Sequence, residues 1–498
     1  RRYAAAPMDQ REALEPEGVA LARARLSALA DLIQANPERA LELAAPEAVR
    51  QALPASVQTL LEEKVNSRGD YEVVCVMPLP GQPGQAESII RSAALNGETF
   101  RVFTYGKALD YVTRKAVPLN GVAVPVGAVS QPPNDPIGLR PGKLMALSAT
   151  PARLLEAGEL EAFQAAQAAE PVCTATGQPW SANGTPVALE FGDRVYPFSA
   201  LALAESWADQ QTEAETLETP QTPDNLPTAE SSYTEGRKRF LLMRVNFPDY
   251  TTEAMSTNTA LTLMRDMASF MAEISYYKHI IAPVGQGSDI TPTMRMSGAV
   301  ATYDNGGLSK LYPEAKQVAQ DVFGYDLSKY DFFFVVTGGK PAYSYAGLGY
   351  VGGVGFHLAN SYFDVRTGAH EFGHNLGLGH ANWWNTGDHS SIGEGTSDEY
   401  GDTFDTMGIA GGGILHFSSF NKNKVGWIPN TDCPTVTASG IYRLYAQDIA
   451  AAPVGTRGLR LTRSGGDYWL EFRQLWTGNK ALMNGVSLRW VTGSSILL

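Results

Sequence analysis

Apolar and polar residues follow different periods in successive parts of the chain. In residues 1–70 the apolar positions recur every three to four residues, which predicts helices. The run that carries this pattern is Val19, Ala22, Leu26, Leu29 and Ile33. Further helical stretches are expected at 38–43 and 57–65. We therefore expect a helical region over residues 1–70.

The pattern becomes β-rich after residue 70. Residues 71–76 and 100–105 are rich in β-branched and aromatic side chains, and Gly and Pro separate such runs, as in strands joined by turns. A β-rich segment is therefore expected over residues 71–210. Residues 211–235 follow as a linker, because Thr, Glu and Pro dominate most of that stretch and large apolar residues are rare.

The second half of the chain has the pattern of a compact domain over residues 236–430. Residues 240–247 and 330–336 are largely apolar, which is typical of buried strands. Residues 257–274 and 312–323 have helical spacing. This mixture predicts an α+β fold in which buried strands are covered by helices.

The last part, residues 431–498, is β-rich again. Strands are expected at 441–445, 458–462 and 468–472, with a hairpin turn at Gly465-Gly466. This region forms either a small β-sandwich or an extension of the preceding domain. The chain begins without Met and ends on an apolar run, so we expect a processed or truncated product.

Composition narrows the possible partners. The net charge of -13 argues against nucleic acid, because phosphate binding needs a basic surface. No apolar run approaches the roughly 20 residues that span a bilayer. The 3 cysteines, Cys75, Cys173 and Cys433, are too few and too far apart for a disulfide framework, although one bridge and one thiol are compatible with them.

Residues 370–380, His-Glu-Phe-Gly-His-Asn-Leu-Gly-Leu-Gly-His, carry the strongest chemical signal. His370 and His374 are four residues apart, so a helix presents both on one face. Gly377 permits a turn that returns His380 to the same point. Three histidines leave one position of a zinc ion open for water, and Glu371 lies beside them as a general base. A surface helix with fortuitous histidines is the competing interpretation.

This segment resembles the metzincin clan of zinc endopeptidases, whose histidine pattern is followed by a methionine turn. The candidate turn is Asp402–Gly408, which contains Met407. With Ala381 after the third histidine, and with residues 399–402 and 420–427, the sequence is most similar to the gametolysin-like peptidases. The resemblance covers about residues 235–498.

The resemblance implies a metzincin-like catalytic domain, with a twisted mixed sheet and an active-site helix. It implies one catalytic Zn²⁺ held by His370, His374 and His380, with Met407 as an apolar floor. It also implies a secreted enzyme, made as a latent proenzyme, that cleaves extracellular or cell-wall proteins. Residues 347–355 are the candidate edge strand for binding extended protein or peptide substrates.

Two further features stay open. In some metzincins a pro-segment thiol blocks the metal, and Cys173 lies upstream of the linker, but it lacks the matrixin pattern of a preceding Arg and a following Gly; a buried or disulfide-bonded Cys is the alternative. An acidic loop suits either Ca²⁺ or plain solvation. Its carboxylates are Asp388, Glu394, Asp398, Glu399, Asp402 and Asp405.

The sequence therefore predicts a latent zinc endopeptidase inhibited by its own pro-region. One rival is a non-catalytic matrix or adhesion protein with a vestigial metal site, against which the presence of Glu371 argues. The other rival is a protein whose N-terminal half is the functional binding module.

Overall fold

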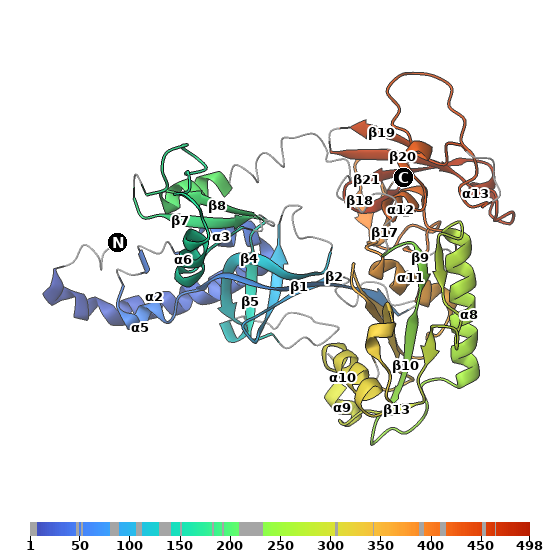
Figure 1. Ribbon diagram of the computed structural model, residues 1–498, viewed down its shortest axis with the longest axis horizontal. Coiled ribbons are helices and arrows are strands. Elements are labelled where there is room, and N and C mark those ends of the chain that lie inside the picture. The colour runs from blue at the N-terminus through green and yellow to red at the C-terminus, as the bar shows by residue number, and fades with distance from the viewer. Residues whose placement is uncertain are drawn as a thin grey trace. The chain divides into compact units, whose positions relative to one another are not determined.

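The computed structural model divides the chain into two compact units (Figure 1). The first contains Arg1–Val73, Arg91–Asn134 and Leu139–Glu218, and the second contains Val74–Ile90, Asp135–Gly138 and Thr219–Leu498. Both contain helices and strands, and the sheets are mixed, so the expected α+β class is confirmed. The structure describes residues 7–45, 49–50, 53–79, 89–105, 112–128, 141–149, 152–181, 184–191, 194–208, 233–303, 307–341, 343–387, 393–408, 415–450, 455–463 and 465–498.

In the first unit, a long helix packs against a five-stranded sheet that closes on itself. Leu29, Ala30 and Ile33 of α2 are buried against Val122 and Leu144 of the strands. Strand order is β1-β2-β3-β5-β4, and β4 also pairs with β1. The helices are α2 (Met8–Ala35), α3 (Pro37–Glu42), α5 (Ala55–Gln58) and α6 (Ala157–Ala165). The strands are β1 (Glu63–Pro78), β2 (Ile89–Leu95), β3 (Glu98–Thr104), β4 (Arg114–Pro125), β5 (Lys143–Leu147), β6 (Ala152–Leu154), β7 (Val187–Phe191) and β8 (Arg194–Phe198).

The helix expected at 57–65 is wrong beyond its first turn, because the chain is already in β1 from Glu63. This stretch is a strand because Glu63–Tyr71 pairs antiparallel with β4. The backbone hydrogen bonds of that pairing outweigh the helical spacing of a few apolar residues. The last residues of β1, Val74–Pro78, belong to the second unit.

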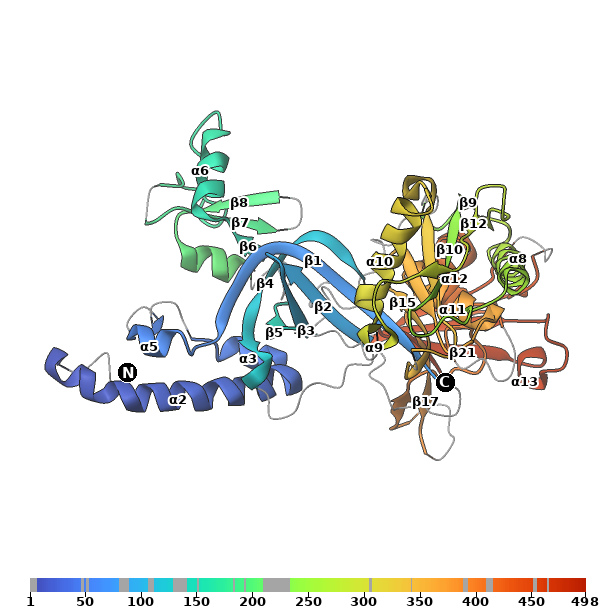
Figure 2. The same cartoon turned by 90° about the horizontal axis from the view of Figure 1, so that it is seen from below.

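The second unit is built around one sheet with the order β12-β10-β14-β16-β15. Its first four strands are parallel, and β15 runs antiparallel to β16. Alternate residues of β10 face opposite sides, so Phe240 and Leu242 pack with α8 and α11, while Leu241 and Met243 pack with α10 (Figure 2). The strands are β10 (Phe240–Asn246), β12 (Asp289–Ile290), β13 (Met294–Arg295), β14 (Phe332–Val336), β15 (Tyr345–Tyr350) and β16 (Gly355–Leu358). The helices are α8 (Thr257–Ile274), α9 (Val300–Tyr303), α10 (Gly307–Asp321) and α11 (Val365–Asn375).

A second sheet in this unit joins the C-terminal strands to the chain that follows the histidine motif. Its order is β18-β17-β22-β21-β20-β19, and β17 begins at Ala381. The strand expected at 441–445 is wrong: this stretch forms no strand, and the side chain of Ile441 is fully exposed. The elements are β17 (Ala381–Asn385), β18 (Thr396–Asp398), α12 (Ser419–Lys424), β19 (Leu459–Arg463), β20 (Gly466–Phe472), α13 (Lys480–Met483), β21 (Val486–Val491) and β22 (Ser495–Leu497). A short pair, β9 (Gly236–Lys238) and β11 (His279–Ile281), completes the unit.

Three predictions concern the chain as a whole. Most of the expected linker at 211–235 lies outside the described residues, which resume at 233. Within the described part, no helix combines the length and apolar character needed to cross a bilayer. None of the three cysteines forms a disulfide, and all three are buried.

Candidate metal centre

Helix α11 presents the first half of the histidine motif. It begins after Asp364, whose carboxylate accepts a hydrogen bond from the backbone N–H of Thr367 at 2.9 Å and so caps the helix. Every residue from Thr367 to Asn375 is buried. After the helix, Gly377 has a φ of +92°, the turn expected from its sequence position, and the chain returns to His380.

Each of the three histidines is held through the same ring nitrogen. Nδ1 of His370 lies 2.8 Å from the carbonyl of Thr406, and Nδ1 of His374 lies 2.8 Å from the carbonyl of Leu378. Nδ1 of His380 lies 2.7 Å from the carboxylate of Glu399. These oxygens only accept, so each Nδ1 carries the proton and donates. In a neutral ring with this tautomer, Nε2 carries the lone pair.

The three rings lie close together, with centroids 4.8 Å apart for His370 and His374, 4.9 Å for His374 and His380, and 5.6 Å for His370 and His380. Nε2 of His370 and Nε2 of His374 are 3.1 Å apart, a distance at which two acceptors repel one another. Burial lowers the pKa of both rings well below the usual value, so protonation does not relieve the repulsion. Nε2 of His380 has no hydrogen-bond partner among the described residues. A cation at the centre would satisfy all three.

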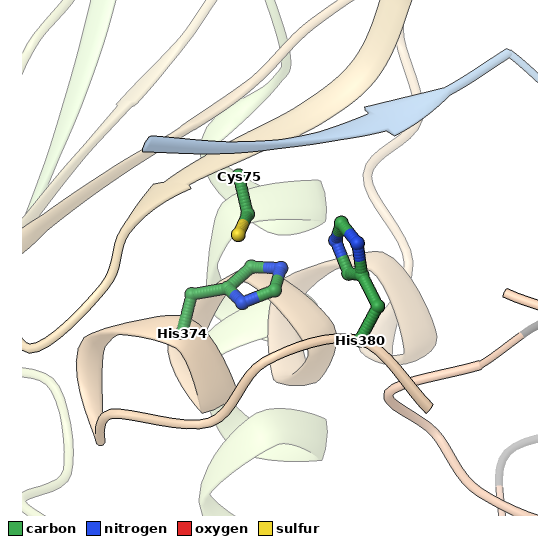
Figure 3. A group of neighbouring side chains, drawn as sticks. All are labelled: Cys75, His374 and His380. Atoms are coloured by element: carbon green, nitrogen blue, oxygen red, sulfur yellow. The ribbon is translucent and has the colours of Figure 1, made fainter. Parts of the chain in front are cut away.

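A thiol completes the group. One ligand atom each from Cys75, His374 and His380 lies within 4.8 Å of the others, and all three side chains are buried (Figure 3). This is the one His, Cys, Asp or Glu group of metal-binding spacing in the part of the chain that the structure describes. His370 stands outside that distance limit but touches the group through His374. The group can hold a metal ion.

The thiol reaches the histidines because of strand register. Val74–Pro78 of β1 pairs antiparallel with β15, with Cys75 opposite Gly349. Paired residues point to the same face of a sheet. A Cβ on Gly349 would lie 2.6 Å from the backbone oxygen of Glu371 and 2.9 Å from Cβ of His374. The glycine thus lets β15 lie against α11, and the side chain of Cys75 points toward the histidines.

Glu371 lies beside the group with an unsatisfied carboxylate. Neither carboxylate oxygen has a hydrogen-bond partner among the described residues, and burial raises the pKa of Glu371 well above its usual value. A Cβ on Gly347 would clash with this carboxylate. The missing side chain of Gly347 therefore leaves room for the carboxylate of Glu371, and that of Gly349 leaves room for His374.

No protein-family model matches this chain, and a search of the curated proteins finds no match either.

The expected methionine turn lies directly under the helix. Met407 is fully buried in the core with Phe372, Phe417 and Trp427. A Cβ on Gly373 would clash with the sulfur of Met407, so the glycine in the middle of the motif lets the methionine pack against α11. The residue before it, Thr406, supplies the carbonyl that holds His370.

Cys173 lies elsewhere, in the core of the first unit. It packs with Leu189 and Phe198, and its sulfur accepts hydrogen bonds from the backbone N–H and hydroxyl of Ser199 at 3.5 and 3.6 Å. Burial raises its pKa, but hydrogen bonds from Thr176 and Ser199 outweigh this and lower the pKa to about 6. The thiol at the histidines is Cys75, which the sequence reasoning missed.

Three carboxylates of the acidic loop are bound to protein groups. Glu399 holds His380, and Asp402 pairs with Arg489 at 2.9 Å. Asp405 accepts hydrogen bonds from the backbone N–H groups of Met407 and Ser418 at 2.9 and 2.8 Å. These three side chains fix the turn around the histidines. Asp388 lies outside the described residues.

Proposed function

We propose that this protein is a secreted zinc endopeptidase made as a latent proenzyme. The observation that carries the proposal is the grouping of three buried imidazoles beside the buried carboxylate of Glu371, which has no hydrogen-bond partner among the described residues. His370, His374 and His380 would hold the ion, and three nitrogens with one thiolate are donors that zinc prefers. Ligand atoms of a four-coordinate zinc lie about 3.3–3.8 Å apart, close to the 3.1 Å between the two Nε2 atoms on α11.

Glu371 is the general base in this proposal. When bound, zinc polarises a peptide carbonyl and lowers the pKa of an attacking water. The carboxylate of Glu371 takes a proton from that water and passes it to the departing amide nitrogen.

Strand β15 is the part of the site that binds an extended substrate in this proposal, along the side that β1 covers. It pairs with β16 on one side and with residues 74–78 of β1 on the other. A peptide that adds to a strand edge uses its backbone for affinity. In the latent protein β1 occupies this edge, and Cys75 provides the fourth donor in place of water.

Replacing Cys75 with Ser in the full-length chain tests this proposal. Loss of the thiolate weakens the hold of β1, and each 1.4 kcal/mol lost corresponds to about a tenfold gain in the open form. We expect casein hydrolysis to rise about tenfold or more, and 1,10-phenanthroline to abolish it.

Cys173→Ser is the matched control, because it also removes a buried thiol but leaves the histidines untouched. It should stay as inactive as the parent chain. A Cys75→Ser protein that binds zinc but cleaves no protein or peptide would refute the peptidase proposal.

A further inference from the structure

Tyr400 stands at the histidines in a backbone conformation that tyrosine rarely adopts. Its φ is +62°, in the left-handed region that favours glycine. The backbone N–H donates to the side-chain oxygen of Asn382, on β17, at 3.2 Å. A residue keeps such a strained conformation only where neighbouring groups stabilise it, and the conformation fixes the direction of the tyrosine ring.

The ring of Tyr400 lies against the rings of two candidate ligands, His380 and His370. The ring centroid of Tyr400 lies 3.9 Å from that of His380, at an interplanar angle of 36°. It lies 5.9 Å from that of His370, at 23°. The tyrosine ring therefore packs against two of the three candidate ligand rings.

The hydroxyl donates a hydrogen bond to the backbone carbonyl of Val76. Val76 follows the thiol residue and lies opposite Leu348 in the antiparallel pairing of β1 with β15. The partner of Tyr400 is thus a main-chain carbonyl of an extended segment that occupies the edge strand. A main-chain carbonyl is present in every peptide, whatever its side chains.

We propose that the hydroxyl of Tyr400 binds a main-chain carbonyl of the substrate, at the position that the carbonyl of Val76 occupies in the latent chain. The inference rests on the proposed peptidase function and adds a substrate-binding residue to it. Residues 74–78 act as a built-in copy of an extended substrate, because they add to the same strand edge. The carbonyl of Val76 is that of an intact, planar peptide, so the hydrogen bond belongs to the ground state.

Kinetics of Tyr400→Phe in the active Cys75→Ser chain give the first test. Phe keeps the ring against His380 and removes only the hydroxyl. A hydrogen bond made equally in the bound substrate and the transition state raises KM and leaves kcat unchanged. The expected rise in KM is about two- to twelve-fold, the range of one hydrogen bond. Loss of kcat with unchanged KM would overturn the proposal.

Alkylation of Cys75 in the metal-free full-length chain gives a second test that needs no activity. The buried thiol reacts only when the segment opens, so loss of the Val76 contact should speed N-ethylmaleimide labelling about two- to twelve-fold. Tyr442→Phe is the control, because it removes a hydroxyl that donates to the carbonyl of Ala438 at 2.6 Å, outside the site.

The two tests separate the failures. If Cys75→Ser has no peptidase activity, the proposed function fails, and the labelling rate still reports on the contact with Val76. If that chain is active but Tyr400→Phe changes neither KM nor the labelling rate, the role of Tyr400 is wrong and the peptidase proposal stands.

Discussion

The second unit contains two buried polar clusters that differ in how their charges and lone pairs are satisfied. In the ionic cluster, Arg489 pairs with Asp402 at 2.9 Å, and Arg473 donates to Glu471 at 2.9 Å. Glu471 also accepts from the backbone N–H of Ser419. In the histidine cluster, two lone pairs face each other, and the carboxylate of Glu371 has no hydrogen-bond partner within the described part of the chain.

The difference indicates what each cluster is for. A buried polar group without a partner costs about 1–3 kcal/mol, so native proteins pair nearly all of them. The ionic cluster pairs its charges within the chain, Arg473 and Arg489 with Glu471 and Arg489 with Asp402, and these pairs hold the C-terminal sheet to the turn before Met407. The histidine cluster does not pair its polar groups in this way within the described residues, which is expected where an ion and a reacting molecule supply the missing partners.

Glu371→Gln, made in the Cys75→Ser chain, should have the largest effect. Removal of a general base costs about 10²–10⁴ in kcat. The unfolding midpoint should not fall, because no hydrogen bond from the described residues is lost with the carboxylate. An activity assay measures kcat, and urea denaturation measures the unfolding midpoint. Undiminished cleavage would show that the unpaired carboxylate has no catalytic part.

Arg489→Met tests the opposite property of the ionic cluster. Breaking a buried ion pair by removing one partner costs about 3–5 kcal/mol of stability, because Asp402 and Glu471 then lose a countercharge. The free energy of unfolding in urea gives this value.

The control for Arg489→Met is Arg265→Met, whose pairing with Asp266 is exposed. It should change stability by less than about 0.5 kcal/mol. Equal stability of the two variants would remove the distinction between a structural ion pair and a surface one.

Acid should destabilise the ionic cluster through Glu471. Burial raises its pKa, but Arg473 and Arg489 outweigh this and lower the pKa from 4.5 to about 2. A depressed folded-state pKa gives stability that is complete above pH 4.5 and is lost as pH falls toward 2. The shift corresponds to about 3 kcal/mol.

Asp402 shifts in the opposite direction, because burial raises its pKa, so it opposes this loss. The quantity to measure is therefore the difference between the parent chain and Glu471→Gln in urea unfolding across that pH range. The same acid sensitivity in both chains would contradict the role of Glu471.

Glu399→Gln should give the smallest effect of the four. The carboxylate of Glu399 orients His380 through Nδ1, and loss of such a partner costs about 10–100-fold in metal affinity. Competition with a fluorescent zinc chelator measures it, and Glu394→Gln, in the same loop, is the control. Equal zinc affinity in the two variants would show that His380 needs no such support.

The spacing of apolar residues, histidines and glycines along the sequence predicted much of the second unit. The helix at 257–274 matches α8 at both ends, and the spacing of His370, His374 and Gly377 anticipated the helix and the turn that bring His380 back. These features depend on residues close in sequence, where period and glycine conformation carry the information.

Cys75 was missed because its place depends on a pairing between strands about 270 residues apart. The run at 71–76 was predicted as a strand, but only the register with β15 decides which face it presents. Tyr400 was missed for the same reason, since its partners, His380 and Val76, come from separate segments. The run at 441–445 shows the converse, because alternating apolar residues without a neighbouring strand to pair with form no sheet.

X-ray absorption at the zinc edge of the full-length protein tests the central claim most directly. With His370, His374, His380 and Cys75 as ligands, the first shell should contain three nitrogens at about 2.0–2.1 Å and one sulfur at about 2.3 Å. Cys75→Ser should lose the sulfur, while Cys173→Ser should keep it. A protein that binds no zinc, or a shell without sulfur in the parent chain, would contradict the account.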